Sequence, residues 1–357
     1  MKRISLFLLL FLLLKATVMY SQDGHPETNF RIVPVSPNAA SLGTFGMIPT
    51  DNYVGQANLT IPIYEIDLDG KKFPIALSYH TDGTRVAQEA TWIGLGWTLQ
   101  AGGCVVRQVQ GTDDFAARGC YNLTDAPWLT NPRFEVTDQN LEKYMGYFKG
   151  DYDAEPDMFY FNAGGHSGSM YFDVLKNNRQ LNAVPTIQTQ EKVVKMVYNT
   201  SNKTWTMTDL EGYVYSFSTK EITYYFLNTI DFFQTDITRS HIFPYYNEPQ
   251  IVTAWMLDSV TSPNGGKITF SYKKESIFTP ISTTEDVISL SKIVNGQLSS
   301  QSPQYFTNKF NYNYSYSKIE QWTLSAITFE GGKVEFGTTD REDIESAETG
   351  KKVQKLS

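Results

Sequence analysis

A serine in a glycine-rich segment is the first candidate for catalysis in this sequence. The segment GHSGS (165–169) is one residue short of the Gly-x-Ser-x-Gly motif that presents a nucleophilic serine in many secreted hydrolases. That motif needs a strand before the serine and a helix after it. Here the runs before and after Ser167 (158–162 and 170–174) are both aromatic and typical of strands. We therefore predict a β-hairpin whose glycines supply the turn, and a serine hydrolase is only the third functional hypothesis.

Carboxylates alternate in the segment DYDAEPD (151–157), a spacing that resembles a calcium loop, where oxygen ligands come from every second position. An EF-hand would need glycine where Pro156 stands and glutamate where the sequence has Asn162. A glycosidase acid–base pair requires a particular distance between its two carboxyl groups, and carboxylates at this spacing in a loop do not indicate that distance. We therefore predict a solvated acidic loop here and a surface turn at Asp113-Asp114, with no metal ligand and no catalytic residue.

Two tryptophans flank two glycines in the segment WIGLGWTLQAGG (92–103). A phosphate-binding loop of the G-x-G-x-x-G type would place its third glycine where the sequence has Leu99, and no Lys-Ser/Thr pair follows. We therefore predict no nucleotide and no other cofactor. The pattern instead indicates a tight chain crossing, in which the backbone passes close under bulky indole rings. The residues of this crossing are Gly94, Gly96, Trp92 and Trp97.

Period-two alternation of apolar residues predicts that strands position these segments. The runs LTIPIYEI (59–66) and FPIALSYH (73–80) alternate in this way, and Asp69-Gly70 between them is a strong signal for a tight antiparallel turn. Further strand and turn units follow at 195–217, whereas 138–148 has the spacing of a short amphipathic helix. Aromatic residues make up 14% of the chain, which favours sheet over helix. The predicted fold class is all-β: antiparallel, hairpin-rich sheets stacked as a sandwich or shell, with at most one or two short helices.

A hairpin pattern occurs twice in the second half of the chain. The run WMLDSVT (255–261) leads through a Gly-Gly-Lys turn into the strand ITF. The run WTLSAIT (322–328) leads through another Gly-Gly-Lys turn into the strand VEF. One hairpin cannot bury its apolar face alone, so such units usually stack side by side. We therefore expect two stacked hairpins in which Trp255 and Trp322 supply buried area.

The N-terminus and the overall charge indicate where the protein works. Lys2 and Arg3 precede an apolar run, 4–14, that is too short to span a bilayer, and this is the pattern of a secretory signal peptide, 1–21. We therefore expect a secreted, extracellular or cell-surface protein, with the periplasm as an alternative, and no membrane span after removal of the signal. The net charge of −8, without a basic block, gives no footprint for nucleic acid.

Cys104 and Cys120 are the only cysteines of the chain. In an oxidising compartment they allow one disulfide across a short loop, and the alternative is two separate buried thiols. Spacing alone does not bring the two Cα atoms within bonding range, so both alternatives stay open.

The segment 59–111 resembles the N-terminal region of secreted RHS/YD-repeat proteins, especially the long ones of Bacteroidetes-type bacteria. More distantly, it is similar to the N-terminal module of plasmid-virulence and insecticidal toxin-complex B proteins. The matching pieces are the strands IPIY and PIALSYH, the sequence GLGWTL, and the Gly102-Gly103 strand that runs to Arg107. Later pieces, including EPDMF (155–159) and the two tryptophan hairpins, extend the resemblance over most of residues 35–345. The Tyr-Asp repeats of the longer family members do not occur in this sequence.

This resemblance implies a role and a domain organisation. We expect a non-enzymatic structural β module of a cell-surface or toxin-related protein, the N-terminal fragment of a larger shell, whose partner is the rest of that shell or another chain. The expected domains are a signal peptide (1–21), an N-terminal extension (22–38), a β module with the Gly-Leu-Gly-Trp crossing (39–175), a hairpin-repeat module (176–345) and a C-terminal strand or tail (346–357).

The alternative function is a secreted glycan-binding surface protein. Aromatic rings on one solvent-facing concave surface would stack on sugars, and Asp and Asn side chains would accept hydrogen bonds from sugar hydroxyls. The rings that this hypothesis needs are those of Tyr213, Tyr215, Tyr245, Tyr246, Trp128 and Trp205.

Overall fold

The structure is a computed structural model that describes residues 34–45, 58–80, 89–111, 113–116, 119–122, 137, 141, 145, 153, 155–173, 184–188, 194–233, 241–242, 250–279, 282–289, 293–294, 297–298, 308–344, 346–347 and 351–357. The expected signal peptide (1–21) and most of the expected helix (138–148) lie outside the described residues, although Leu141 and Met145 are helical. None of the described helices is long and apolar enough to cross a membrane.

Strands make up most of the described chain, which confirms the predicted all-β class. The helical elements are α2 (Pro37–Phe45) and the 3₁₀ turn η1 (Cys120–Asn122). The strands are β1 (Asn58–Leu68), β2 (Lys71–His80), β3 (Trp97–Gln100), β4 (Gly103–Gln108), β5 (Met158–Ala163), β6 (His166–Tyr171), β7 (Thr186–Ile187), β8 (Val194–Asn199), β9 (Thr204–Asp209), β10 (Val214–Phe233), β11 (His241–Ile242), β12 (Ile251–Thr261), β13 (Lys267–Phe278), β14 (Ser282–Ser289), β15 (Ile293–Val294), β16 (Gln297–Leu298), β17 (Asn308–Phe329), β18 (Gly332–Glu335), β19 (Thr338–Asp340) and β20 (Gln354–Leu356).

Strands β1, β2 and β3 form a small antiparallel sheet in that order. The predicted turn joins β1 to β2, and both of its residues, Asp69 and Gly70, have the positive φ (49° and 91°) that a tight hairpin requires. The register pairs Leu59 with Tyr79 and Ile61 with Leu77, so these apolar residues of the two runs lie on a common face. β1 is the edge strand of this sheet, and a β-bulge follows its Pro62.

Four strands of the large sheet close into a ring, because β10 pairs with β12, β12 with β13, β13 with β17, and β17 with β10. The two predicted tryptophan hairpins are β12–β13 and β17–β18. β13 pairs with β17, so the prediction that these hairpins lie side by side is confirmed. The ladder between β12 and β13 covers only 259–261 and 267–269, and β4 pairs with β12 next to it, at Ala254–Met256.

Two further groups of strands extend from the ring and enclose the main core. β4 continues to β5, β6 and β7, while β10 continues to β9 and β8. Aromatic rings from both groups meet between them, and the centroid of Trp205 of β9 lies 5.3 Å from that of Phe159 of β5 and 6.1 Å from that of Trp255 of β12. Burial of one such side chain stabilises the fold by about 2–3 kcal/mol. The core therefore holds the strand groups together.

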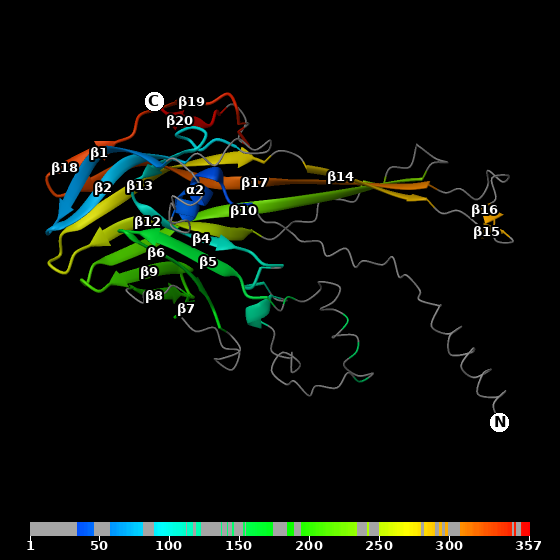
Figure 1. The fold of residues 1–357 in the computed structure, drawn as a ribbon, viewed down its shortest axis with the longest axis horizontal. Coiled ribbons are helices and arrows are strands. Elements are labelled where there is room, and N and C mark those ends of the chain that lie inside the picture. Colours follow the sequence, from blue (N-terminus) through cyan, green and yellow to red (C-terminus); the bar gives the residue numbers. More distant parts are fainter. Residues whose placement is uncertain are drawn as a thin grey trace, which may run out of the picture.

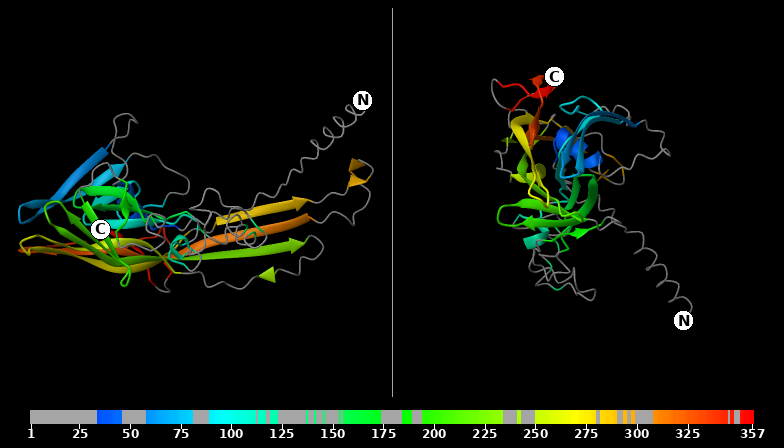
Figure 2. Two further views of the ribbon diagram at one scale, coloured as in Figure 1. Left: turned by 90° about the horizontal axis from the view of Figure 1, so that it is seen from below. Right: turned by 90° about the vertical axis from the view of Figure 1, so that its left-hand side faces the viewer.

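Beyond this body, β10 and β17 continue and form a three-stranded arm with β14 (Figures 1 and 2). Its ladders join 226–233 of β10 to 309–316 of β17, and 308–315 of β17 to 282–289 of β14. In Figure 1 the arm runs away from the body, and the short strands β15 and β16 lie near its tip. Among the described residues, no helix and no second sheet layer covers the arm.

Both ends of the described chain are part of the body. Asn38 of α2 accepts a hydrogen bond from the Trp92 N–H at 2.9 Å, and the Asn162 side chain donates to the Leu42 carbonyl at 3.0 Å. At the other end, β20 pairs with β19, and the Leu356 N–H donates to the Trp92 carbonyl at 2.9 Å. The expected C-terminal tail is therefore a paired strand that packs on the crossing segment.

Candidate functional site

Ser167 lies on a strand, in an exposed position of β6 opposite Asn162 of β5. Gly164 and Gly165 form the turn before it, with φ of 59° and 83°. The chain continues as β6 after the serine, so the predicted hairpin is confirmed and the strand–serine–helix order of a nucleophile elbow is not formed. A Cβ on Gly164 would overlap the Tyr215 hydroxyl, which explains the glycine at this turn.

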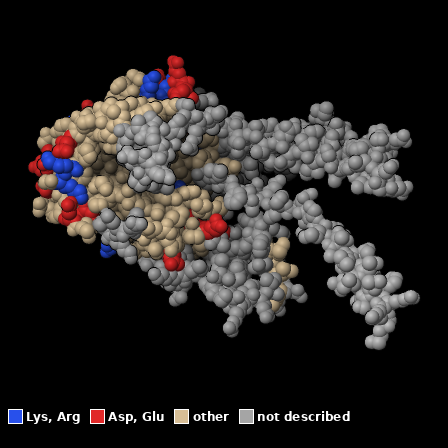
Figure 3. Space-filling model, viewed as in Figure 1, with Lys and Arg blue, Asp and Glu red and all other residues tan. Residues whose placement is uncertain are grey.

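Asp209 is the centre of a polar cluster at the end of the body where hairpin turns meet. Its Oδ2 lies 2.5 Å from Lys71 Nζ, 3.1 Å from Tyr215 Oη and 3.8 Å from His166 Nε2. Partial burial opposes the charge on Lys71, but hydrogen-bonded ion pairs with Asp209 and Glu211 outweigh it and raise the pKa of Lys71. Figure 3 shows Lys, Arg, Asp and Glu side chains gathered at this end. The hydrogen bonds of Asp209 with Lys71 and Tyr215 tie β2, β9 and β10 together.

Arg107 of β4 is buried and pairs with acidic residues from two different segments. Its Nε donates to Asp157 Oδ2 at 2.8 Å, and its Nη2 forms ion pairs with Asp157 and Asp113. Asp157 is 0% exposed, and its Oδ1 accepts the Gln110 N–H at 2.7 Å. Asp153 is buried as well. The expectation of a solvated acidic loop is therefore wrong here, because the Arg107 guanidinium compensates the Asp157 carboxylate inside the protein.

Asp114 lies beside this ion pair and is also 0% exposed, so the expected surface turn is wrong for this residue. Its Oδ2 accepts the Asp157 N–H at 2.6 Å, while its Oδ1 has no hydrogen-bond partner among the described residues. Burial raises the pKa of Asp114, and the charge of Asp157 raises it further. No group of His, Cys, Asp and Glu side chains in the described part of the chain has metal-binding geometry. The cluster fixes the segment that follows β4 to the strand β5.

The crossing segment is a double turn organised by Thr91. The Oγ1 of Thr91 lies 3.0 Å from the Gly94 carbonyl oxygen and 2.7 Å from the Trp97 carbonyl oxygen. Gly94 and Gly96 have φ of 141° and 76°, so both use backbone conformations that favour glycine. A Cβ on Gly94 would lie at an ordinary 3.5 Å from Trp97, so Gly94 is needed for its φ rather than for close passage under an indole. Trp92 is buried, and Trp97 is half-buried.

The two repeat tryptophans each connect a hairpin to another segment. Trp255 is 1% exposed, and its indole N–H donates to the Lys203 carbonyl at 2.8 Å. Trp322 is half-buried, and its indole N–H donates to the Lys220 carbonyl at 2.7 Å. Both rings therefore combine burial with one hydrogen bond.

Cys104 and Cys120 are free thiols, so the disulfide considered from the sequence is not formed. Cys104 is fully buried on β4, and Cys120 is half-buried at the start of η1. Burial raises the pKa of both thiols, that of Cys120 to about 12. Reactive cysteines have a lowered pKa instead, so these two residues have the character of structural thiols.

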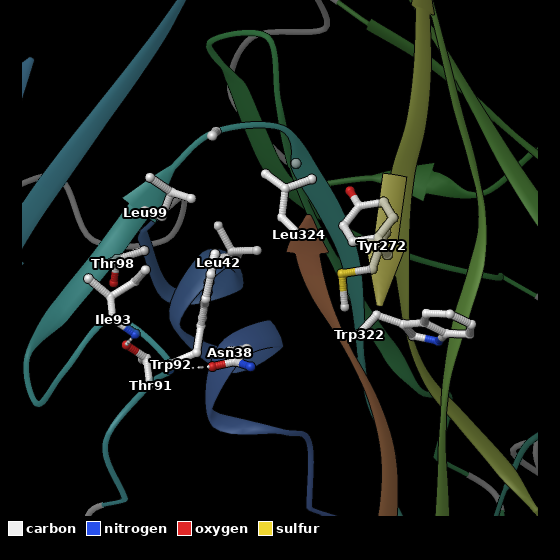
Figure 4. Close-up of a pocket in the computed structure, with 13 residues that line it drawn as sticks. Asn38, Leu42, Thr91, Trp92, Ile93, Thr98, Leu99, Tyr272, Trp322 and Leu324 are labelled. Atoms are coloured by element: carbon white, nitrogen blue, oxygen red, sulfur yellow. Dashed lines mark hydrogen bonds between the residues drawn. The ribbon is translucent and has the colours of Figure 1, made fainter. Parts of the chain in front are cut away.

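Two cavities lie where α2 meets the sheets. Figure 4 shows the smaller one, of about 30 Å³, which Asn38 and Trp322 help to line. The larger one, of about 180 Å³, has Phe73 and Phe270 among its lining residues. Leu42 of α2 lines both cavities, so the position of this helix determines how open they are.

Three of the rings needed for a glycan-stacking surface belong to the core. Tyr213, Tyr215 and Trp205 are 6%, 0% and 1% exposed. Trp128, Tyr245 and Tyr246 lie outside the described residues. The three described rings are therefore not available to stack on a sugar.

Two buried ionisable residues with central roles were not singled out from the sequence. Arg107 follows the apolar run GCVV on one strand, and a charge in such a position indicates a buried partner. Glu221 of β10 is 0% exposed, and its Oε1 accepts hydrogen bonds from the Ser36 N–H and the Thr253 hydroxyl. No local signal marks Glu221, because its partners come from distant parts of the chain.

A scan against protein-family models and a search of curated proteins find no match. Among solved structures, a chain in the crystal structure of TcdB2-TccC3-Cdc42 is similar over 77% of this chain, with 13% sequence identity and a TM-score of 0.27. The matched region spans 9% of that chain. A TM-score of this size does not establish a common fold.

Proposed function

We propose that the chain is a secreted structural β module without catalytic activity, part of an RHS/YD-repeat-like cell-surface or toxin-related protein. In this role it docks onto, or begins, a larger β shell formed by the rest of that protein or by another chain. The resemblance of residues 59–111 supports the class of protein, and the all-β architecture agrees with it.

The observation that carries the proposal is the arm formed by β10, β14 and β17. An open sheet of three strands with two uncovered faces is only marginally stable in water, and its edges present unpaired backbone groups. The arm is uncovered among the described residues (Figures 1 and 2). A further layer of a shell would cover its faces, and further strands would pair with its edges.

The edge strand β1 supports the same role. Four of its apolar side chains are exposed over six positions, namely Leu59 (51%), Ile61 (42%), Ile63 (53%) and Tyr64 (50%). Clustered apolar exposure on an edge strand is typical of a surface that another polypeptide covers.

The polar clusters of the body also fit a structural role. The Arg107 guanidinium holds Asp157 and Asp113, and Asp209 holds Lys71 and Tyr215. Each cluster joins strands from different parts of the chain. These groups are therefore engaged in cohesion of the body, and the proposal assigns them no chemical step.

A photo-crosslinking experiment in the cells that make the protein tests the proposal. A photoreactive residue at Ile63 of β1 should form an adduct with another segment of a large assembly. The matched control is Leu210, which is 80% exposed at a hairpin turn and should form none. Absence of an Ile63 adduct would contradict the proposal, as would an ester- or peptide-hydrolysing activity that Ser167→Ala abolishes.

A further inference from the structure

The N-terminal segment of the described chain is anchored by an unusual helix cap. Ser36 precedes α2, and its Oγ accepts the Ala39 N–H at 3.1 Å, as an N-cap residue does. In a capping box, a Glu or Gln at the position of Ala39 would accept the N–H of Ser36. Here the Glu221 carboxyl of β10 takes that place, with Oε1 at 2.9 Å from the Ser36 nitrogen.

Two threonines extend this anchor. The Thr253 hydroxyl donates to Glu221 Oε1 at 3.0 Å, and it lies 3.2 Å from the Thr223 hydroxyl. The Thr223 hydroxyl donates in turn to the Pro34 carbonyl at 3.0 Å. The hydrogen bonds of Pro34 and Ser36 with the ring of strands therefore both belong to one network that includes Glu221.

Glu221 is a buried carboxyl without a compensating cation. It is 0% exposed, and its Oε2 has no hydrogen-bond partner among the described residues. In that same part of the chain, no Lys, Arg or His forms an ion pair with it. The titratable group that faces it is the Cys104 thiol of β4, whereas β12 contributes Thr253 and the N-terminal segment contributes Ser36. Burial raises the pKa of Glu221, and the hydrogen bonds from Ser36 and Thr253 oppose this only in part.

We propose that Glu221 is a pH-sensitive latch that holds residues 34–45 on the body while its carboxyl is neutral and releases them when it ionises. A negative charge at this position would be buried without a cation, which is costly, and movement of the segment lets water reach it. Because Leu42 lines both cavities, release of α2 also opens them to solvent.

The sign of the effect follows from linkage. In the released state Glu221 titrates near the usual value of 4.5, whereas in the held state its pKa is higher. The held state therefore keeps its full stability below pH 4.5 and loses stability as pH rises above that value. Because one proton is involved, the equilibrium constant between the held and released states shifts toward release by at most about tenfold per pH unit.

Amide hydrogen exchange across a pH series tests the latch, with each rate divided by the intrinsic rate at the same pH. In the wild type, protection of the α2 amides should fall by up to about tenfold per pH unit above the usual glutamate pKa. In Glu221→Gln, which keeps the acceptor oxygen but does not titrate, α2 protection should not depend on pH.

Asp114→Asn is the matched control, because it also removes a buried carboxyl but one that does not contact residues 34–45. This variant should keep the wild-type pH dependence at α2. A constant α2 protection in the wild type would overturn the proposal even if Glu221→Gln fails to fold. An unchanged slope in Glu221→Gln would overturn it as well.

Discussion

At the residue Asp157, sequence reasoning and structure disagree for a clear physical reason. An acidic residue next to other acidic residues is normally solvated, and the segment 151–157 was assigned to the surface on that basis. The compensating guanidinium belongs to Arg107, which is 50 positions away in the chain. Gly94 and Gly96 were assigned to a tight crossing under indole rings, whereas the structure places both in turns with a positive φ, a backbone conformation that glycine adopts readily. A buried ion pair is a property of two distant residues. The apolar run before Arg107 indicates a buried partner, but no local pattern identifies Asp157 as that partner.

Replacement of Asp114 by Asn should flatten the pH dependence of stability. Burial and the charge of Asp157 raise the pKa of Asp114 above 3.8, its usual value in the unfolded chain. As pH rises from 3.8 toward the raised pKa of the folded state, the unfolded state releases this proton first. The unfolding free energy therefore falls by up to about 1.4 kcal/mol per pH unit over this range. Urea denaturation of both proteins over a pH series measures this slope, and an equal slope in the variant would contradict the assignment.

Among the secondary-structure elements, hairpins were predictable and their assembly was not. The Asp69-Gly70 turn and the two Gly-Gly-Lys turns lie between alternating runs, so each hairpin is encoded locally. The stacking of the tryptophan hairpins was inferred because the pattern repeats. The pairing of β10 with both β12 and β17, which closes the ring, depends on contacts between distant segments. The anchor of α2 on Glu221 is non-local in the same sense.

The two repeat tryptophans should differ in their contribution to stability. Trp255→Phe removes volume from a site that is 1% exposed and leaves the Lys203 carbonyl without its donor, so it should cost about 2–3 kcal/mol. Trp322→Phe affects a half-buried ring and should cost about 1 kcal/mol. Urea denaturation measures both values. A larger loss of unfolding free energy for Trp322→Phe than for Trp255→Phe would contradict the expectation that the more deeply buried tryptophan contributes more to stability.

In the whole molecule, a cohesive body carries an uncovered arm. Aromatic packing between the two strand groups, the ring of four strands and the polar clusters hold the body together. The arm continues two of its strands, β10 and β17, beyond that core and adds β14 (Figure 2). Composition and periodicity predicted the all-β class, and the repeated hairpin predicted stacking. They gave no sign of the arm, because its strands have the same local pattern as those of the body, and only the three-dimensional path of the chain separates the two.

Amide hydrogen exchange of the arm tests the proposed structural role most directly. In the isolated protein, the amides of 226–233 and 309–316 should exchange at least about a hundredfold faster than those of β12, because no second layer protects them. In the native assembly, the same amides should become protected while those of β12 stay unchanged. Arm amides that are as protected as β12 in the isolated protein, or that remain unprotected in the assembly, would contradict the account.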